Sequence, residues 1–309
     1  MKNLSQQLKQ SLILLLLLNT PLSTAATTDS ELPSLSTPYY AEPMTKRSAA
    51  DAEALKQLFN KELFQLQQTR VSGITPQVYV DHIPQNLGSL SIKDMKQLFI
   101  QLILPCTLKV NAHIEELRAA VTTLLTKQNN GQKLTHIEEQ WLADLTKHYS
   151  VKADGTESLL DRMDIIPPSL AITQAIMESG WGRSRFAKQG NVLFGLHLPK
   201  NSQRKFIKAN GANVKLAVYD SIFEAVDAYI HTINTTRAYR KLRDIRRRLR
   251  NQKEQPDGWN LAVGLGQYSE LGDKYIGKLR SIIKFNKLAI FDKAHLGRSH
   301  KSFIVRISR

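Results

Sequence analysis

Apolar residues recur at helical spacing through the first half of the chain. The first such helix, predicted from about residue 49 to Thr69, is marked by Leu55, Leu58, Phe59, Leu63 and Leu66. Residues 91–127 predict one long helix, kinked at Pro105 because proline cannot donate to the preceding turn. A capping box of Thr135 and Glu138 predicts a third helix that runs to about Tyr149. Residues 49–150 are therefore predicted to form an all-helical N-terminal region.

A more apolar helix is predicted after Pro167 and Pro168, which favour a helix start, with Ser169 able to cap it. Apolar residues occupy most of its circumference, so this helix should be buried on nearly every side. Gly180 and Gly182 supply the left-handed stop. Glu178 falls in the last turn, which places a carboxyl group at the mouth of an apolar helix.

Burial and the negative end of the helix dipole both disfavour an ionised Glu178, so we predict that the pKa of Glu178 is raised. A carboxylic acid that stays protonated near neutral pH can act as a general acid. A glutamate at a helix end can equally serve only to hydrogen-bond the following turn. The residues alone leave both interpretations open.

The second half continues with a predicted β-hairpin, formed by residues 204–208 and 215–219 around Asn210-Gly211. Ser221 and Glu224 form a second capping box and start another helix. Residues 237–253 then carry nine arginines and lysines beside an apolar stripe. This segment predicts either a solvated helix face or, given the net charge of +16, a surface that attracts a polyanion. No motif indicates nucleic acid as a partner.

The two ends of the chain differ from this central part. Residues 2–26 have the basic start, the apolar core and the small residues of a secretory signal peptide, and no cysteine that could carry a lipid anchor follows it. Residues 27–48 are rich in Ser, Thr and Pro and predict a linker, whereas residues 292–309 form a basic tail. The chain contains one cysteine, Cys106, which we interpret as a small buried hydrophobe. We predict an exported protein, periplasmic or extracellular, with no stable membrane insertion once the signal is removed.

Two blocks carry a resemblance to a known family. Gln174-Ala175 with Glu178-Ser179-Gly180-Trp181-Gly182 forms the first block, and Asn191 with Leu193-Phe194-Gly195 forms the second. Together they resemble the glucosaminidases of glycoside hydrolase family 73, and the order of regions is similar to that of the Bax-type proteins. The resemblance implies a mainly helical, α+β, lysozyme-like glucosaminidase domain at residues 151–291. It also implies cleavage of N-acetylglucosaminyl β-1,4 bonds in the glycan strands of peptidoglycan.

The same resemblance assigns roles to particular residues. It implies Glu178 as the acid and Tyr268 as the tyrosine beside it, with Tyr275 supporting the helix that follows. We expect Gln174, Asn191, Trp181, Phe194 and Tyr219 to bind the substrate, although Trp181 is equally suited to sealing the helix end. No metal or other cofactor is expected, because the histidines show no ligand spacing.

The second catalytic group stays open, because the predicted hairpin contains no Asp or Glu where many members of the family carry a carboxylate. Three routes remain: another carboxylate, a water molecule held by Tyr268, or the N-acetyl group of the substrate. The candidate carboxylates are Asp220, Glu224, Asp227 and Glu270. Two other functions also remain: a muramidase or lytic transglycosylase of lysozyme-like fold, and a catalytically silent wall-binding protein.

Overall fold

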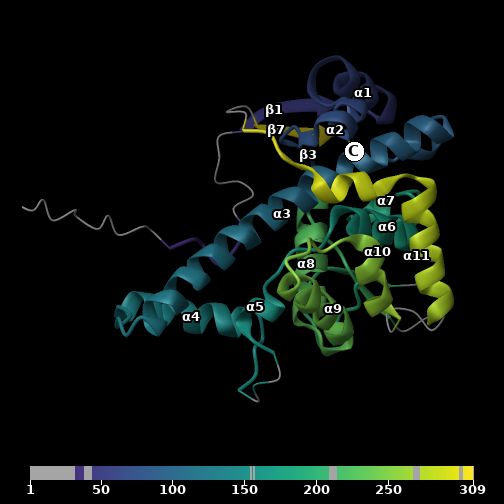
Figure 1. The fold of residues 1–309 in the computed structure, drawn as a ribbon. Helices are drawn as coiled ribbons and strands as arrows, with labels where there is room; N and C mark the ends of the chain where they lie inside the picture. The colour runs from purple at the N-terminus through teal and green to yellow at the C-terminus, as the bar shows by residue number, and fades with distance from the viewer. Residues whose placement is uncertain are drawn as a thin grey trace, which may run out of the picture. The chain divides into compact units, whose positions relative to one another are not determined.

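The computed structural model describes residues 32–37, 44–153, 155, 157–208, 214–266, 272–298 and 302–308, and Figure 1 shows its ribbon. From Leu32 onward the chain belongs to one compact unit. The predicted signal peptide, the turn at Asn210-Gly211, Tyr268 and Glu270 lie outside the described residues. Within the described ranges, no helix is long and apolar enough to span a membrane.

The first predicted helix is interrupted. Helix α1 covers Ala52–Leu58 and continues as a π-helical turn, Phe59–Leu63, before the backbone of Phe64 becomes extended. Helix α2 then covers Leu66–Ser72 and ends at Gly73, whose φ of 74° is left-handed. The apolar spacing therefore predicted the helical character of this stretch but missed the break within it, where Phe64 is extended and buried.

The next two predicted helices are confirmed. Helix α3 runs over Ile92–Asn129 and stays helical through Pro105, and helix α4 covers His136–His148 with the predicted capping box in place. Helix α3 packs against both α6 and α8, so it is the element around which the second half of the chain is arranged (Figure 1). Cys106 on this helix is fully buried, and burial raises the pKa of its thiol, as expected of a small hydrophobe.

The second half is a set of short helices with one small hairpin. Strands β4 and β5 are antiparallel and confirm the predicted hairpin. The elements are α5 Leu159–Arg162, α6 Pro168–Ser179, α7 Arg185–Gly190, β4 Phe206–Lys208, β5 Lys215–Ala217, α8 Ile222–Thr235, the 3-10 turn η3 Arg237–Tyr239, α9 Arg240–Asn251, α10 Gly258–Leu261, the 3-10 turn η4 Ala262–Leu265 and α11 Asp273–Phe285.

A parallel sheet joins the two ends of the chain and was not predicted. Strand β7, Ser302–Ile307, lies between β1, Met44–Ala49, and β3, Val78–Val80, and pairs in parallel with both. A second pair, β2 Ile74–Thr75 with β6 His295–Leu296, repeats this link. Residues 44–48 of the predicted linker and residues 302–307 of the predicted tail are therefore strands. The N-terminal region is mainly helical but not all-helical.

The short 3-10 turns η2, Leu87–Ser89, and η5, Leu288–Lys293, complete the described elements. The predicted class, mainly α with a small β-hairpin, is confirmed. One continuous apolar core includes residues from α3, α6, α8 and α11. This shared core holds the last turn of α6 in a fixed place relative to its neighbours.

Candidate active site

Helix α6 presents Glu178 because both of its ends are fixed. At the start, Asp292 accepts hydrogen bonds from the backbone N–H of Ser169 at 2.8 Å, from its hydroxyl at 2.7 Å and from the N–H of Gly258 at 3.1 Å. Ser169 thus donates to a buried carboxylate, whereas the sequence predicted it as an acceptor for the helix. Burial raises the pKa of Asp292 to about 6.

The end of α6 is a tight left-handed turn. Gly180 caps the helix with φ 59° and ψ 48°, and Trp181 and Gly182 also have positive φ, at 62° and 73°. The hydroxyl of Ser179 accepts the N–H of Gly182 at 2.8 Å. A Cβ on Gly182 would lie 3.0 Å from the ring of Phe99, so this position requires glycine for both conformation and space. The predicted stop is confirmed, and it leaves Glu178 one residue from the helix end.

Glu178 lies at the end of a directed chain of hydrogen bonds. The hydroxyl of Tyr229 donates to Oε1 of Gln174, and Nε2 of Gln174 donates to the hydroxyl of Tyr275 at 3.3 Å. Tyr275 in turn donates to Oε1 of Glu178 at 3.1 Å. Gln174, Tyr229 and Tyr275 are almost fully buried, so these hydrogen bonds are shielded from water. The chain therefore makes Oε1 the acceptor from Tyr275 and leaves Oε2 outside these hydrogen bonds.

The surroundings of Glu178 favour its neutral form. Removal of the carboxyl group from water raises its pKa, and the hydrogen bond from Tyr275 lowers it by less, so the net direction is upward as the sequence predicted. The residue is still reachable from solvent at the helix end. A Cβ on Gly195, whose φ is 60°, would lie 3.5 Å from Oε2, so this glycine leaves that oxygen uncovered.

Several residues predicted to bind substrate lie underneath the site. Phe194 is 2% exposed and stacks on the ring of Tyr229, with centroids 4.1 Å apart and planes 10° from parallel. Gln174 is fully buried in the chain of hydrogen bonds. A sugar ring stacks on an accessible face, which neither side chain offers in this structure, so contact of Phe194 and Gln174 with substrate stays a prediction.

Asn191 and Tyr219 are also buried. The amide of Asn191 bonds to the carbonyls of Asp81 and Tyr219, both at 3.2 Å, and to His82 at 2.9 Å, which ties the second block to the N-terminal region. Tyr219 is 6% exposed and lies below the guanidinium of Arg204, 5.5 Å from the ring centroid. Both side chains are occupied by these contacts within the protein, and their contact with substrate stays a prediction.

Trp181 stays partly accessible, but the structure gives it packing partners. Its ring meets Phe99 edge-on with centroids 5.9 Å apart, and Nζ of Lys96 lies 5.0 Å from the ring centroid. Of the two roles predicted for Trp181, these contacts support the one in which it seals the end of α6. Binding of a sugar by the remaining surface stays a prediction.

The candidates for a second carboxylate have other partners. Asp220 is exposed and pairs with Lys205 at 2.9 Å, and Glu224 accepts the N–H of Asp220 at 3.0 Å. The helix cap is confirmed in part: Ser221 accepts the N–H of Glu224 at 3.1 Å. Glu270 lies outside the described residues. Among the described residues, no carboxylate affects the pKa of Glu178.

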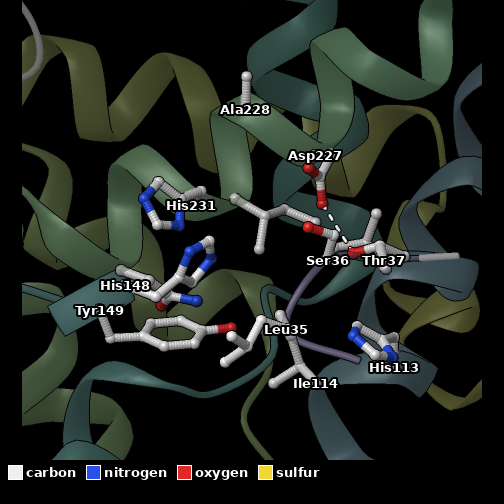
Figure 2. Close-up of a pocket in the computed structure, with 13 residues that line it drawn as sticks. Leu35, Ser36, Thr37, His113, Ile114, His148, Tyr149, Asp227, Ala228 and His231 are labelled. Carbon is white, nitrogen blue, oxygen red and sulfur yellow. Dashed lines mark hydrogen bonds between the residues drawn. The ribbon is translucent and has the colours of Figure 1, made fainter. Parts of the chain in front are cut away.

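Asp227 lies in a different pocket, shown in Figure 2. This pocket has a volume of about 190 Å³ and contains His113, His148 and His231. The hydroxyl of Thr37 donates to Oδ1 of Asp227 at 2.9 Å, and burial raises the pKa of this carboxyl. Asp227 and Tyr229 are neighbours on α8, but Asp227 faces this pocket while Tyr229 belongs to the Glu178 site. Asp227 is therefore not positioned as the second carboxylate.

The segment that leads into α6 is held by a buried cluster of charges that was not predicted. Arg246, fully buried, donates to the carbonyls of Asp164 and Ile165, each at 3.0 Å. Arg250 donates to Oδ1 of Asp164 at 2.7 Å. Arg243, 1% exposed, bonds to both oxygens of Glu157, at 2.6 and 3.0 Å. This part of the basic segment is therefore structural and is not a solvated face.

Comparison with known proteins identifies a matching family, a relative and similar solved structures. The family model of the glucosaminidases, described as mannosyl-glycoprotein endo-beta-N-acetylglucosaminidase, matches residues 154–288. The chain is 32% identical over 201 residues to Protein bax of Escherichia coli strain K12, across 63% of this chain and 71% of that protein.

Among solved structures, the catalytic domain of the autolysin Auto from Listeria monocytogenes is similar with a TM-score of 0.37 and 18% identity, over 75% of this chain and 99% of that chain. The glycoside hydrolase domain of FlgJ from Salmonella typhimurium gives a TM-score of 0.31 and 22% identity, over 48% of this chain and 87% of that chain.

Proposed function

Because this chain belongs to the Bax-type family of glucosaminidase-domain proteins, we propose that it hydrolyses peptidoglycan by cutting N-acetylglucosaminyl β-1,4 bonds, with Glu178 as the general acid. The observation that carries the proposal is the arrangement of Glu178: a carboxyl group with a raised pKa, one oxygen held by Tyr275 and the other uncovered beside Gly195. This arrangement favours the neutral carboxyl group and leaves Oε2 open to the oxygen of a leaving group.

The proposed reaction begins with proton transfer from Oε2 of Glu178 to the glycosidic oxygen. The bond from C1 to that oxygen breaks, its electron pair stays on the leaving oxygen, and positive charge develops on the sugar. Glu178 becomes a carboxylate, which the hydroxyl of Tyr275 stabilises at Oε1. Hydrogen bonding that is stronger to the ionised acid than to the neutral one favours this step.

We propose that the positive sugar is trapped by the substrate's N-acetyl oxygen or by water, without a nucleophilic side chain. The support is the engagement of Asp220, Glu224 and Asp227 with other partners. On the first route, a water molecule then attacks C1 as the bond from C1 to the N-acetyl oxygen breaks, and on the second, water attacks C1 directly. On either route the water loses its proton to Glu178, which regains its acid form. Tyr268, which lies outside the described residues, stays our prediction for the group that holds this water. Loss of turnover in a folded Asp220→Asn or Glu270→Gln variant would contradict this route.

The proposed site of action is the cell wall on the far side of the inner membrane, in the periplasm or outside the cell. The predicted signal peptide at residues 2–26 and the basic net charge of +16 support this proposal. Peptidoglycan carries free carboxylates in its stem peptides, so wall binding should weaken as salt rises.

The direct test is digestion of purified sacculi, followed by reduction of the soluble products with borohydride and mass spectrometry of the reduced end. We expect reduced N-acetylglucosamine from the wild type and none from Glu178→Gln, whereas the matched variant Glu254→Gln, an exposed residue, should behave as wild type. Reduced muramic acid would instead indicate a muramidase, and an anhydro end a transglycosylase. No product from folded wild type, with sacculus binding retained, would indicate a binding protein.

A further inference from the structure

The basic segment at residues 237–253 divides into two groups in the structure. Arg243 and Arg246 are buried, and Arg247 and Arg250 pair with carboxylates. A second group, Arg237, Arg240 and Lys241, is exposed. Its three side chains line one open pocket. The exposed group therefore has no part in the cluster that holds the segment before α6.

This pocket lies between η3, the start of α9 and η4, and has a volume of about 640 Å³. Gly264 and Gly266 form its other wall. A Cβ on Gly264 would lie 2.3 Å from Cα of Leu242, so the two backbones are in direct contact and the wall is rigid. The pocket is thus a built feature of the fold and not a gap between mobile surface side chains.

The charge of the pocket is strongly positive. Among the described residues that line it, Asp244 is the acidic one, and it already pairs with Arg247 at 2.8 Å. Across the described residues, Arg237, Arg240 and Lys241 have no hydrogen bond or ion pair to a carboxylate. Three cations that converge on one pocket without anions repel one another, and a ligand with negative charge removes this repulsion.

Helix α11 connects the pocket to the helix that carries Glu178. It packs against both α6 and η4, the wall of the pocket, and it also carries Tyr275, which donates to Glu178. Tyr239, which lies between Arg237 and Arg240 in the chain, has a pKa raised mainly by burial and in smaller part by the charge of Glu178. These links are the basis for relating the three cations to a polymer bound at Glu178.

We propose that this pocket is a subsite for the carboxylates of the stem peptides carried by the glycan substrate. The inference rests on the function proposed above and adds to it a preference: strands with peptides should bind better than strands without them. Arginine suits carboxylates because its planar donors can bond both oxygens. The carboxylates are attached to the same polymer that Glu178 would cut, so one substrate can occupy both places.

The test compares three substrates: peptide-bearing strands, strands stripped by an amidase, and strands whose carboxylates are converted to amides. The variant is Arg237→Gln/Arg240→Gln/Lys241→Gln. The matched control, Lys133→Gln/Lys147→Gln/Arg248→Gln, removes the same charge from exposed residues elsewhere. We expect KM on peptide-bearing strands to rise about tenfold in the variant, with kcat within about twofold, and the control to be unchanged.

The variant should also lose the difference between peptide-bearing and stripped strands, and amidated strands should behave as stripped ones. An equal loss on all three substrates, or no loss on any, would overturn the proposal. Binding of anionic phosphatidylglycerol vesicles that disappears only in the variant, with the strand preference intact, would assign the pocket to a membrane surface instead.

Failure of the proposed function can be separated from failure of this subsite by measuring binding in a Glu178→Gln background. In one outcome, the wild type cuts no strand but still binds peptide-bearing strands better than stripped ones, and the triple variant loses this binding preference. The subsite proposal is then supported and the catalytic proposal is contradicted. If strands are cut but the preference is absent, the subsite falls alone.

Discussion

Two carboxyl groups in this protein lose contact with water to different extents and respond in opposite directions. Burial alone raises the pKa of Asp164, but Arg246, Arg250 and Arg118 reverse the effect, so its net pKa is lowered. Glu178 stays exposed at the end of α6, but the partial removal of its carboxyl group from water still raises its pKa, and only the hydroxyl of Tyr275 opposes this. The cost of desolvation is offset by cations at Asp164 and is not offset by any cation at Glu178. The fold thus favours the ionised form of Asp164 and the neutral form of Glu178.

The largest expected effect comes from removing the carboxyl group of Glu178. Glu178→Gln should lower kcat by about 10²- to 10⁴-fold, the usual contribution of a general acid, because glutamine keeps the shape but cannot give up a proton. Rates of release of reducing ends from sacculi measure it. The midpoint of urea unfolding should match wild type, since Glu178 makes one polar contact. Near-wild-type turnover would remove Glu178 from the mechanism.

Substitution of Asp164, the ionised carboxylate, should change the stability of the protein. Asp164→Asn leaves Arg246, fully buried, without its anion and should lower the free energy of unfolding by about 3–5 kcal/mol, measured by urea denaturation. Asp144→Asn, an exposed aspartate, is the control and should change it by less than about 0.5 kcal/mol. Because the folded pKa of Asp164 is lowered, its stabilisation is present above the unfolded value and is lost as pH falls through the folded pKa. A variant as stable as wild type would contradict this prediction, because it would show that the loss of the Asp164 carboxylate beside Arg246 does not destabilise the fold.

Asp292 provides a second contrast with Asp164, because the pKa of Asp292 is raised in the folded protein whereas that of Asp164 is lowered. Its folded pKa of about 6 lies above the ordinary 3.8, so the folded state binds this proton more tightly, and the resulting stabilisation is fully present below the unfolded value. It is lost as pH rises from about 4 to about 6, by roughly 3 kcal/mol in total. The difference in unfolding free energy between wild type and Asp292→Asn should fall by that amount over this range. A flat difference would indicate that the hydrogen bonds from Ser169 and Gly258 offset the burial.

The smallest expected effect concerns Tyr275. Tyr275→Phe removes the hydrogen bond that lowers the pKa of Glu178, so this pKa should rise further. The alkaline limb of the rate against pH should therefore move to higher pH, while kcat/KM at its maximum falls about tenfold through loss of support for the carboxylate. Tyr239→Phe is the control, because Tyr239 does not contribute to the pKa shift of Glu178, and it should leave the limb unmoved. A shift of the limb to lower pH would contradict the direction of the hydrogen bond.

The sequence predicted those features whose signals are local. The proline pair and the glycine turn predicted both ends of α6, and Thr135 with Glu138 predicted the start of α4. Glu178 could be chosen because helix pattern and motif agree on it. By contrast, the break at Phe64 depends on how that ring packs, and helical spacing alone does not report it.

What the sequence missed depends on partners distant in the chain. Arg243 and Arg246 looked like a solvated face because their partners, Glu157 and Asp164, lie about 80 residues earlier. Their spacing beside Leu242 and Leu249 on the buried side was the available signal. Tyr275 was given a packing role because nothing local points its hydroxyl at Glu178. Phe194 and Gln174 were predicted to touch substrate because a motif gives residue identity and not burial.

The parallel sheet has a consequence for how the protein is made. Strand β7 at residues 302–307 is the middle strand, so neither β1 nor β3 has its partner until that late segment has been synthesised. Pairings of such long sequence separation form slowly. Strand β1 is therefore still without its partner while most of the chain is being synthesised, and the three-stranded sheet can form only at the end of synthesis.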